Sequence, residues 1–430
     1  MTKIGMISLG CAKNLVDSEI VLGMLSDKFE LVNTVEESDI VIINTCGFIE
    51  ASKQESIENI LDVVKSGKKT VVIGCLVERY LNELKEAIPE VNLWVRIKDY
   101  KELNSKLEEL INDKQEIPAF NPFNRLVTTP SYMAYLRISE GCNNCCTYCA
   151  IPLIRGSFRS RKMEDILKEA HALASNGYKE IVLISQDTTR YGSDFTNKVT
   201  IVDLLTKICE IKEFKSVRLL YLYPDEISDE LIEFIKNNPK VAPYFDIPFQ
   251  HSSNAILKAM NRRGTREEYI ELINKIRREI PHAILRTTYI VGFPGESEDD
   301  FVDLVKFTKE VRFDHMGAFK YSREDGTKSY SFDNQIDEAL KVGRLNKIMD
   351  VQKKISYEKN KEHIGEVMSG IVIGYNEKSN QYSLRSYWNA PDDIDGNIYF
   401  ESKKPLNLGD EVKVKIKSAF VYDLYGELVE

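Results

Sequence analysis

Short apolar runs alternate with longer amphipathic stretches over the first hundred residues of the chain. The runs are rich in β-branched residues, as expected for parallel strands that are buried on both faces. They comprise Ile4–Leu9, Ile40–Ile43 and Val71–Ile73. Between them, apolar residues recur at the spacing of one helical face, at Ile57, Ile60, Leu61 and Val64. This alternation predicts an open α/β sheet domain over residues 1–116.

A second series of strand and helix patterns follows a polar, proline-containing connector and extends over residues 128–363. The predicted strands are Met133–Ile138, Ile181–Ile184, Val217–Leu222, Tyr244–Ile247, Ile284–Tyr289 and His315–Phe319. The predicted helices are Met163–Ser175, Ile201–Ile211, Asp229–Lys236, Arg266–Glu279, Glu298–Val311 and Ile336–His363. Repeated β/α units predict a barrel or partial barrel, in which the chemistry lies at the carboxyl ends of the strands.

The pattern changes to short alternating strands over residues 364–430. The predicted strands are Val367–Tyr375, Tyr382–Trp388, Gly396–Glu401, Glu411–Phe420 and Tyr425–Val429. They predict a small closed five-stranded β-barrel, a class that commonly binds oligonucleotides. From Glu366 onward, however, eleven Asp and Glu stand against seven Lys and Arg. This acidic balance favours a basic protein partner over nucleic acid.

The composition is that of an ordinary soluble protein, with 430 residues, 43% hydrophobic and 29% charged, and a formal net charge of -9. No run approaches the roughly 20 apolar residues that span a bilayer, and no basic segment followed by an apolar one opens the chain. We therefore expect a cytoplasmic protein without a membrane partner. In that reducing compartment, cysteines are more often metal ligands or catalysts than disulfides.

Four of the eight cysteines lie between Cys142 and Cys149. In the spacing Cys142-x3-Cys146-x2-Cys149, one loop offers three thiolates, the usual ligands of iron-sulfur clusters. Three cysteines leave one of the four irons of a cubane cluster open for a substrate or cofactor. Zinc is the alternative, because Cys142-x2-Cys145 and Cys146-x2-Cys149 are overlapping CxxC pairs. Four ligands so close together would be cramped around a tetrahedral ion, which favours the cluster.

Three further cysteines each follow a predicted strand of the first domain and adjoin a glycine. They are Cys11, Cys46 and Cys75, beside Gly10, Gly47 and Gly74. Parallel strands place their carboxyl ends on one edge of the sheet, so these cysteines are predicted to converge. They could hold a second cluster with one open iron, and the glycines would let the backbone approach it closely. The alternative is that each is a small buried apolar residue.

Polar loops follow several strands of the second domain, where a (β/α) barrel carries its site. They are Ser185–Asp187, Tyr223–Asp225, Pro248–His251 and Gly292–Glu296. His251 could be a general base or a ligand, but a lone histidine here is as often a positioning hydrogen-bond partner. The basic cluster Arg155–Arg161 is either a solvated turn or a site for carboxylate or phosphate. Gly292 to Gly295 form a side-chain-poor loop suited to the close approach of a nucleoside.

The cysteine spacing, with the aromatic Tyr148 before the third cysteine, resembles that of radical S-adenosylmethionine (SAM) enzymes. The three regions together resemble the radical SAM methylthiotransferases, which join an amino-terminal methylthiotransferase domain, a radical SAM barrel and a carboxyl-terminal TRAM domain. Within that family the chain is similar to the RimO branch, which modifies an aspartate of small-subunit ribosomal protein twelve. The motifs that carry this likeness are Ser8–Glu19, Arg155–Arg161, Gln186–Gly192 and Ala390–Gly396. Cys145 departs from the pattern, which has a basic residue there.

The resemblance implies two 4Fe-4S clusters and SAM as cofactors. The cluster on Cys142, Cys146 and Cys149 would bind SAM and cleave it to a radical that takes hydrogen from the β-carbon of the target aspartate. The cluster on Cys11, Cys46 and Cys75 would present the sulfur that becomes the methylthio group, methylated by a second SAM. Further SAM contacts are expected from Tyr148, Gln186, Gly292 and Gly295.

The implied partners are the ribosomal protein, free or in the ribosome, and an electron donor such as flavodoxin or ferredoxin. The acidic TRAM barrel would dock the basic ribosomal protein. Two other interpretations remain at this point: the same chemistry on tRNA adenosine (the MiaB type), and a non-catalytic metal- or RNA-binding protein.

Overall fold

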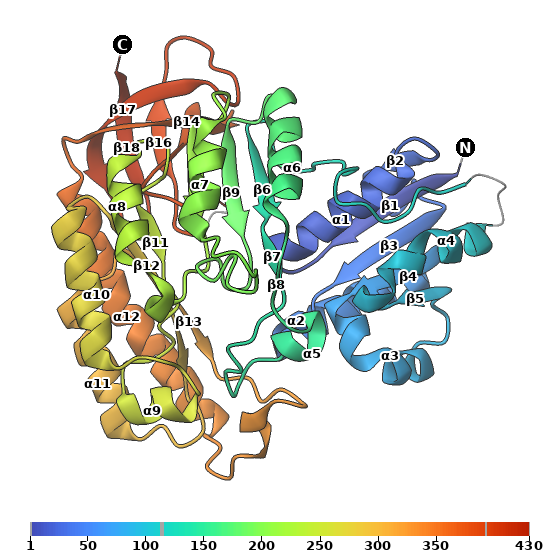
Figure 1. Ribbon diagram of the computed structural model, residues 1–430, viewed down its shortest axis with the longest axis horizontal. Coiled ribbons are helices and arrows are strands. Elements are labelled where there is room, and N and C mark those ends of the chain that lie inside the picture. The colour runs from blue at the N-terminus through green and yellow to red at the C-terminus, as the bar shows by residue number, and fades with distance from the viewer. Residues whose placement is uncertain (1, 112–115, 392–393, 430) are drawn as a thin grey trace.

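The computed structural model describes residues 2–111, 116–391 and 394–429, arranged as three regions (Figure 1). An α/β layer with the amino terminus lies on one side, a set of central strands with outer helices lies on the other, and a β-barrel caps one end of the central strands. Asp392 and Asp393, part of one motif noted above, lie outside the described residues. Among the described helices, none combines the length and the apolar character that crossing a membrane requires.

The amino-terminal region is an open, fully parallel sheet in the order β2-β1-β3-β4-β5. Its strands are β1 (Lys3–Ser8), β2 (Glu30–Val32), β3 (Ile40–Thr45), β4 (Lys69–Gly74) and β5 (Leu93–Val95). Its helices are α1 (Ala12–Leu25), α2 (Glu50–Lys65), α3 (Cys75–Ala87), the 3-10 helix η1 (Ile97–Glu102) and α4 (Leu103–Ile111). Successive strand residues point to opposite faces, so Ile42 packs with α1 and α4 while Ile43 packs with α2 and α3. The predicted open α/β sheet is confirmed.

Six parallel strands form the central region. They are β6 (Met133–Arg137), β9 (Glu180–Ile184), β10 (Ser216–Leu219), β11 (Tyr244–Asp246), β12 (Ile284–Val291) and β13 (His315–Lys320). Two three-stranded ladders, β10-β9-β6 and β11-β12-β13, meet where the Ala242 N–H donates to the Val217 carbonyl at 2.9 Å. The strands therefore curve into an open, partial (β/α) barrel, as predicted.

Helices cover the outer face of the central strands. They are α6 (Met163–Ser175), α7 (Ile201–Glu210), α8 (Asp229–Asn237), α10 (Arg266–Glu279), α11 (Glu298–Val311) and α12 (Glu338–Glu362), with the short α5 (Ile151–Arg155) and α9 (Asn254–Ala259) in loops. Capping boxes at Thr200, Thr265 and Ser297 begin α7, α10 and α11, because each hydroxyl accepts a backbone N–H of the first turn.

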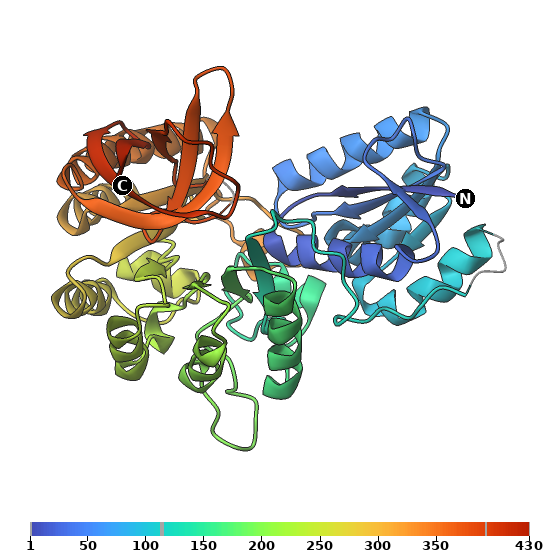
Figure 2. The same ribbon diagram turned by 90° about the horizontal axis from the view of Figure 1, so that it is seen from above.

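The inner face of the central strands is covered by α1 and by the carboxyl-terminal barrel. Side chains such as Val182 and Tyr244 point inward and pack with apolar residues of both, whereas Leu183 and Phe245 pack with the outer helices. Figure 2 shows α1 lying between its own sheet and the central strands. The core of the molecule is therefore shared among all three regions.

The carboxyl-terminal region is a closed β-barrel in the order β14-β15-β16-β18-β17. Its strands are β14 (Val367–Asn376), β15 (Gln381–Ser386), β16 (Ile398–Glu401), β17 (Glu411–Ala419) and β18 (Leu424–Val429). The prediction that a strand extends to Trp388 was wrong, because the chain leaves the barrel after Ser386. Trp388 is instead 1% exposed in a loop that enters the amino end of the central strands.

That loop is held by buried polar contacts with three central strands. Asp395 accepts hydrogen bonds from Tyr244 Oη at 2.5 Å and from Arg286 Nη1 at 2.6 Å. The Trp388 carbonyl lies 2.9 Å from His315 Nε2. Burial opposes the charge of Asp395, but His315 and Arg286 outweigh it and hold the pKa of this carboxyl below its usual value of 3.8. Trp388 and Asp395 therefore cover the amino ends of β11, β12 and β13.

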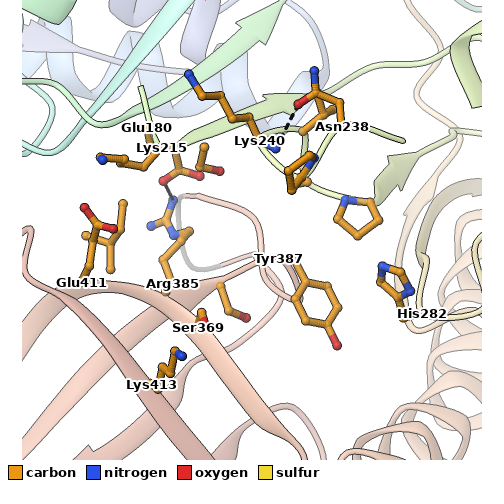
Figure 3. Close-up of a pocket in the computed structure, with 18 of the residues that line it drawn as sticks. Glu180, Lys215, Asn238, Lys240, His282, Ser369, Arg385, Tyr387, Glu411 and Lys413 are labelled. Atoms are coloured by element: carbon orange, nitrogen blue, oxygen red, sulfur yellow. Dashed lines mark hydrogen bonds and ion pairs between the residues drawn. The ribbon is translucent and has the colours of Figure 1, made fainter. Parts of the chain in front are cut away.

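A cavity of about 1080 Å³ lies beside this loop, between the barrel and the amino ends of the central strands (Figure 3). Arg385 reaches toward Glu180 across it at 3.9 Å. None of the cysteines lines it, and both cysteine groups follow the opposite, carboxyl ends of the strands. The cavity is therefore separate from the cysteine sites.

The amino-terminal and central regions are also joined by a buried ion pair. Glu324, in the loop after β13, accepts from Arg79 Nη1 of α3 at 2.7 Å and lies 3.2 Å from Lys53 Nζ of α2. Both side chains of the Arg79–Glu324 pair are nearly fully buried. This loop also continues to Ser329, whose N–H donates to the Thr147 carbonyl of the cysteine loop at 2.8 Å. One segment thus contacts both cysteine-bearing regions.

We expect Asp395→Asn to destabilise the protein by about 3 kcal/mol, because it leaves the buried Arg286 without its closest carboxylate. Thermal unfolding should show a lower midpoint at neutral pH. The folded-state pKa of Asp395 is depressed, so its contribution is full above the unfolded value of about 3.9 and is lost as the pH falls below it. The difference in unfolding midpoint between wild type and the Asp395 variant should therefore become smaller in acid.

Asp62→Asn provides the control. Asp62 pairs with Lys65 at the surface, and the Asp62 side chain is 76% exposed. Its effect should stay within about 0.5 kcal/mol. Equal midpoints for the Asp395 variant and wild type at neutral pH would contradict the structural role of this carboxylate.

Candidate active site

The loop with four cysteines leaves the central barrel at the carboxyl end of β6, between the short strand β7 (Ser139–Glu140) and α5. Gly141 has a φ of +74°, and a Cβ there would lie 2.2 Å from the Ser157 carbonyl oxygen. The Cys142 N–H donates to the Gly156 carbonyl at 3.1 Å. Glycine is therefore required where the returning chain closes the loop.

Cys142, Cys146 and Cys149 lie close enough for their thiols to interact electrostatically. Burial raises the pKa of Cys149 to about 12, with a further contribution from Cys146. Burial also raises the pKa of Cys142, and Cys146 adds to that shift. All three are partly buried. The raised pKa values of Cys142 and Cys149 are suited to a cationic iron centre, which would stabilise their thiolates.

Cys145 differs from these three. It is exposed and has a φ of +52°, and its carbonyl accepts from Asn261 Nδ2 at 3.0 Å. A left-handed turn at this position directs the loop so that its neighbours, rather than Cys145, are partly buried. The geometry therefore favours Cys142, Cys146 and Cys149 as the ligands. Cys145 is a surface residue of the turn.

A cation and an aromatic side chain flank Cys146. Arg262 Nη1 lies 4.0 Å from Cys146 Sγ, and its guanidinium stacks 4.0 Å above the Tyr223 ring. Tyr223 Oη lies 3.8 Å from the same sulfur. The buried Nε of Arg262 has no hydrogen-bond partner among the described residues. A fixed positive charge here would stabilise an anionic ligand at the loop. The loop with Tyr223 was predicted to lie at the site, whereas Arg262 was not found from the sequence.

The cysteines of the amino-terminal region follow three adjacent strands, β1, β3 and β4. Burial raises the pKa of Cys75 to about 12 and also raises that of Cys46, and the charge of Cys11 adds to both shifts. Cys11 keeps exposed surface but is surrounded by protein atoms. Burial opposes its ionisation, yet the charges of Lys13 and Arg155 and the backbone N–H of Asn14 lower its pKa overall. The three cysteines therefore lie at one edge of the sheet and influence one another electrostatically, while their role as cluster ligands stays a prediction.

The glycines beside these cysteines serve mainly to bring neighbouring loops together. A Cβ on Gly10 would lie 2.9 Å from Cys46 Cβ, and one on Gly47 would lie 2.7 Å from Leu76 Cα. Gly74 has a φ of +103°, and its Cβ would meet Asn44 Oδ1 at 2.3 Å. These glycines thus allow neighbouring loops of the protein to approach each other closely.

Arg155, six residues after Cys149, connects the two cysteine groups. Its Nη1 donates to Asp17 Oδ2 at 2.7 Å, and its Nη2 donates to Asn14 Oδ1 at 2.6 Å and lies 3.5 Å from Cys75 Sγ. Arg137 Nη1 donates to the other oxygen of Asp17 at 2.6 Å. Burial opposes the charge of Asp17, but the two guanidiniums hold the pKa of this carboxyl below its usual value. Arg155 is therefore not part of a solvated turn; it holds a carboxylate of its own chain.

The residues predicted to contact SAM lie around the cysteine loop, and their roles stay predictions. Tyr148 packs edge-on against Phe293, with ring centroids 6.5 Å apart. Gln186 Nε2 donates to Glu140 Oε1 at 2.9 Å, while its buried Oε1 lacks a partner among the described residues. That oxygen is available for a ligand donor.

The glycine loop after β12 is anchored by a buried glutamate. Glu296 Oε2 accepts the Gly292 N–H at 2.7 Å, and Glu296 Oε1 accepts from Arg344 at 2.8 Å. A Cβ on Gly292 would strike Lys341 Cγ at 2.4 Å, whereas one on Gly295 would meet nothing within 4 Å. His251 is fully buried, and its Nδ1 accepts the Ser253 N–H at 2.9 Å. These contacts fix the loop and favour a positioning role for His251.

The donor sets fit clusters better than single ions. Within the part of the chain that the structure describes, no three His, Cys, Asp or Glu side chains are grouped as a single metal ion would need. A tetrahedral zinc site requires ligands about 2.0–2.3 Å from one centre. A cubane cluster distributes its ligands over separate irons, so its thiolates lie farther apart. Groups of cysteines with no carboxylate or histidine among them are typical of iron-sulfur donor sets, and the assignment of these six cysteines to clusters stays a prediction.

The fold and the cysteine loop define a radical SAM protein. Residues 136–308 match the Radical SAM superfamily, residues 3–96 match the uncharacterized protein family UPF0004, and residues 364–429 match the TRAM domain. The radical SAM methyltransferase TsrM from Kitasatospora setae, solved with tryptophan and a SAM analogue, superposes with a TM-score of 0.58 at 11% identity. The match covers 83% of this chain and 89% of that one. At that identity the likeness shows the fold alone.

Curated relatives give the particular family. The ribosomal protein uS12 methylthiotransferase RimO of Clostridium novyi (strain NT) is 46% identical, over 99% of this chain and 97% of that protein. The protein of the same name from Clostridioides difficile (strain 630) is 47% identical, over 100% and 99% of the two chains. This chain belongs to the RimO family of ribosomal protein uS12 methylthiotransferases.

We expect Cys146→Ala to lose SAM cleavage and the iron of one cluster, because it removes a ligand of the central loop. Cys145→Ala should keep both, since Cys145 is an exposed residue of the turn. Anaerobic reconstitution followed by iron determination and assay of 5'-deoxyadenosine measures the two effects separately. A Cys145 variant with the iron content of the Cys146 variant would show that the ligand set is wrong.

Proposed function

We propose that this protein adds a methylthio group to the β-carbon of an aspartate in ribosomal protein uS12, using two SAM molecules and two 4Fe-4S clusters. The observation that carries the proposal is the 46–47% identity to RimO proteins over nearly the whole chain. Two groups of three cysteines, at the carboxyl ends of two sheets, support the assignment of two clusters.

The ligand assignments follow from these two groups. Cys142, Cys146 and Cys149 hold the cluster that, when bound, supplies the electron for SAM cleavage. Cys11, Cys46 and Cys75 hold the cluster that carries the sulfur to be transferred. A small electron-transfer protein such as flavodoxin or ferredoxin is the proposed reductant. A cofactor radical is needed because no side-chain acid or base removes hydrogen from an unactivated carbon.

Residues of this chain position the reactants and limit side reactions. Arg262 and Tyr223 flank Cys146 of the central loop, and the guanidinium places a positive charge beside it. Arg155 fixes the distance between the two cysteine groups, because it contacts Asp17, Asn14 and Cys75 at once. Trp388 and Asp395 pack against the amino ends of the central strands, away from the cysteine loop at their carboxyl ends.

Mass spectrometry of uS12 and of tRNA nucleosides, from cells with and without the gene, tests the substrate. We expect the methylthio group on the uS12 aspartate to disappear with the gene, while tRNA stays unchanged. Reintroduction of the wild-type gene should restore it. A methylthio group lost from tRNA, with uS12 unaffected, would overturn the substrate and retain only the radical mechanism.

Cys46→Ala should leave SAM cleavage partly intact and stop methylthio transfer, because it removes a ligand of the amino-terminal cluster only. Purified variant and wild type are compared for 5'-deoxyadenosine and for modified uS12. Cys209→Ala is the matched control, since Cys209 packs against the core of the central barrel and should not affect either product. Full methylthio transfer by the Cys46 variant would refute the role of the second cluster.

A further inference from the structure

Lys13 extends from the amino-terminal region into the mouth of the central barrel. It is the second residue of α1, two residues after Cys11, and it is 7% exposed. Its Nζ donates to the Ser185 carbonyl after β9 at 3.1 Å and lies 3.7 Å from the centre of the Tyr221 ring after β10. The ammonium therefore sits at the carboxyl ends of the central strands, where a (β/α) barrel carries its reaction.

The surrounding carboxylates have cations of their own. Glu140 lies 3.1 Å from Arg137 and 3.4 Å from Arg155. Asp246 lies 3.5 Å from Arg286 and accepts the Tyr221 N–H at 3.0 Å. Lys13 forms no ion pair with a carboxylate of any described residue, and Cys11 is its strongest electrostatic partner, ahead of Glu140 and Asp246. A buried ammonium without a paired carboxylate is costly, so the site is suited to a carboxylate that arrives with a ligand.

The position of the ammonium is fixed from the other side by Tyr221. This residue has a φ of +63°, a conformation that a bulky side chain adopts rarely. Asp246 stabilises it by accepting its backbone N–H. Such a strained residue is retained where the surrounding structure requires one orientation. Here the orientation places an aromatic face under a lysine that spans the two cysteine-bearing regions.

We propose that Lys13 binds the side-chain carboxylate of the target aspartate, an inference that rests on the proposed function. In aspartate the β-carbon is bonded directly to this carboxylate. An ion pair with Lys13 would therefore hold the reacting carbon between the two cysteine groups. The carboxylate of SAM offers the same chemistry, so the experiment must distinguish the two sources. The charge of the amino-terminal cluster is the other possible partner.

The test compares binding of uS12 with the target aspartate and of uS12 with asparagine at that position. Wild-type enzyme, reconstituted and without reductant, should bind the aspartate form about ten- to a hundredfold more tightly. Lys13→Met should bind both forms equally, and Lys13→Arg should retain part of the preference. Lys65→Met is the control, because Lys65 is a surface lysine whose side chain is 74% exposed.

Three results would overturn the inference. Equal binding of both uS12 forms by wild type would show that the carboxylate is not recognised. Weaker SAM binding by Lys13→Met with an unchanged aspartate preference would assign Lys13 to SAM. Loss of iron from Lys13→Met, with the preference intact in the remaining loaded fraction, would assign it to the cluster. Failure of wild type to modify uS12 at all is a different result, which refutes the proposed function itself.

Discussion

The arrangement of both cysteine groups depends on one buried carboxylate, Asp17, and the two guanidiniums that share it. Asp17 belongs to α1, whose first residue follows Cys11, while Arg155 belongs to the segment that follows Cys149. Removing charges from water is unfavourable unless the geometry and the hydrogen bonds are good. Asp17 meets that condition with contacts of 2.6 and 2.7 Å. The interaction of Asp17 with the two guanidiniums therefore contributes little to the net free energy of unfolding. Its main effect is to fix the position of the two cysteine groups relative to each other.

Local signals explain which parts of the fold could be predicted from the sequence. The bounds of α10 and α11 were predicted correctly from their apolar pattern, and capping boxes at Thr265 and Ser297 begin these helices in the structure. The edge strands β2 and β5 were missed, since three residues are too short to show a period. Trp388 was placed in a strand because it continues an alternating pattern, whereas its position is decided by packing against a distant region.

In the candidate site, too, residues with a local sequence signal were predicted, whereas residues positioned by distant contacts were not. Each cysteine group was found because the ligand spacing or the strand ends are visible in the sequence. Arg262 and Lys13 were not found, because their partners are far away: Lys13 contacts Ser185 across 172 positions of sequence. Arg155 was noted as a basic residue, but nothing local indicates that Asp17 neutralises it. Tertiary contacts of this kind give no periodic signal.

The packing of Trp388 and Asp395 against the central strands has a consequence for how such chains can diversify. The strands of the carboxyl-terminal β-barrel, which carries the loop of these two residues, hydrogen-bond to one another in a closed ring. On that basis alone the β-barrel could be exchanged between proteins as a module. Its buried contacts with Tyr244, Arg286 and His315 prevent a free exchange. A transplanted barrel would leave these polar groups unpaired unless the host strands carried matching residues. Recombination at the linker before residue 364 should therefore succeed only between hosts whose strand ends share this polar set.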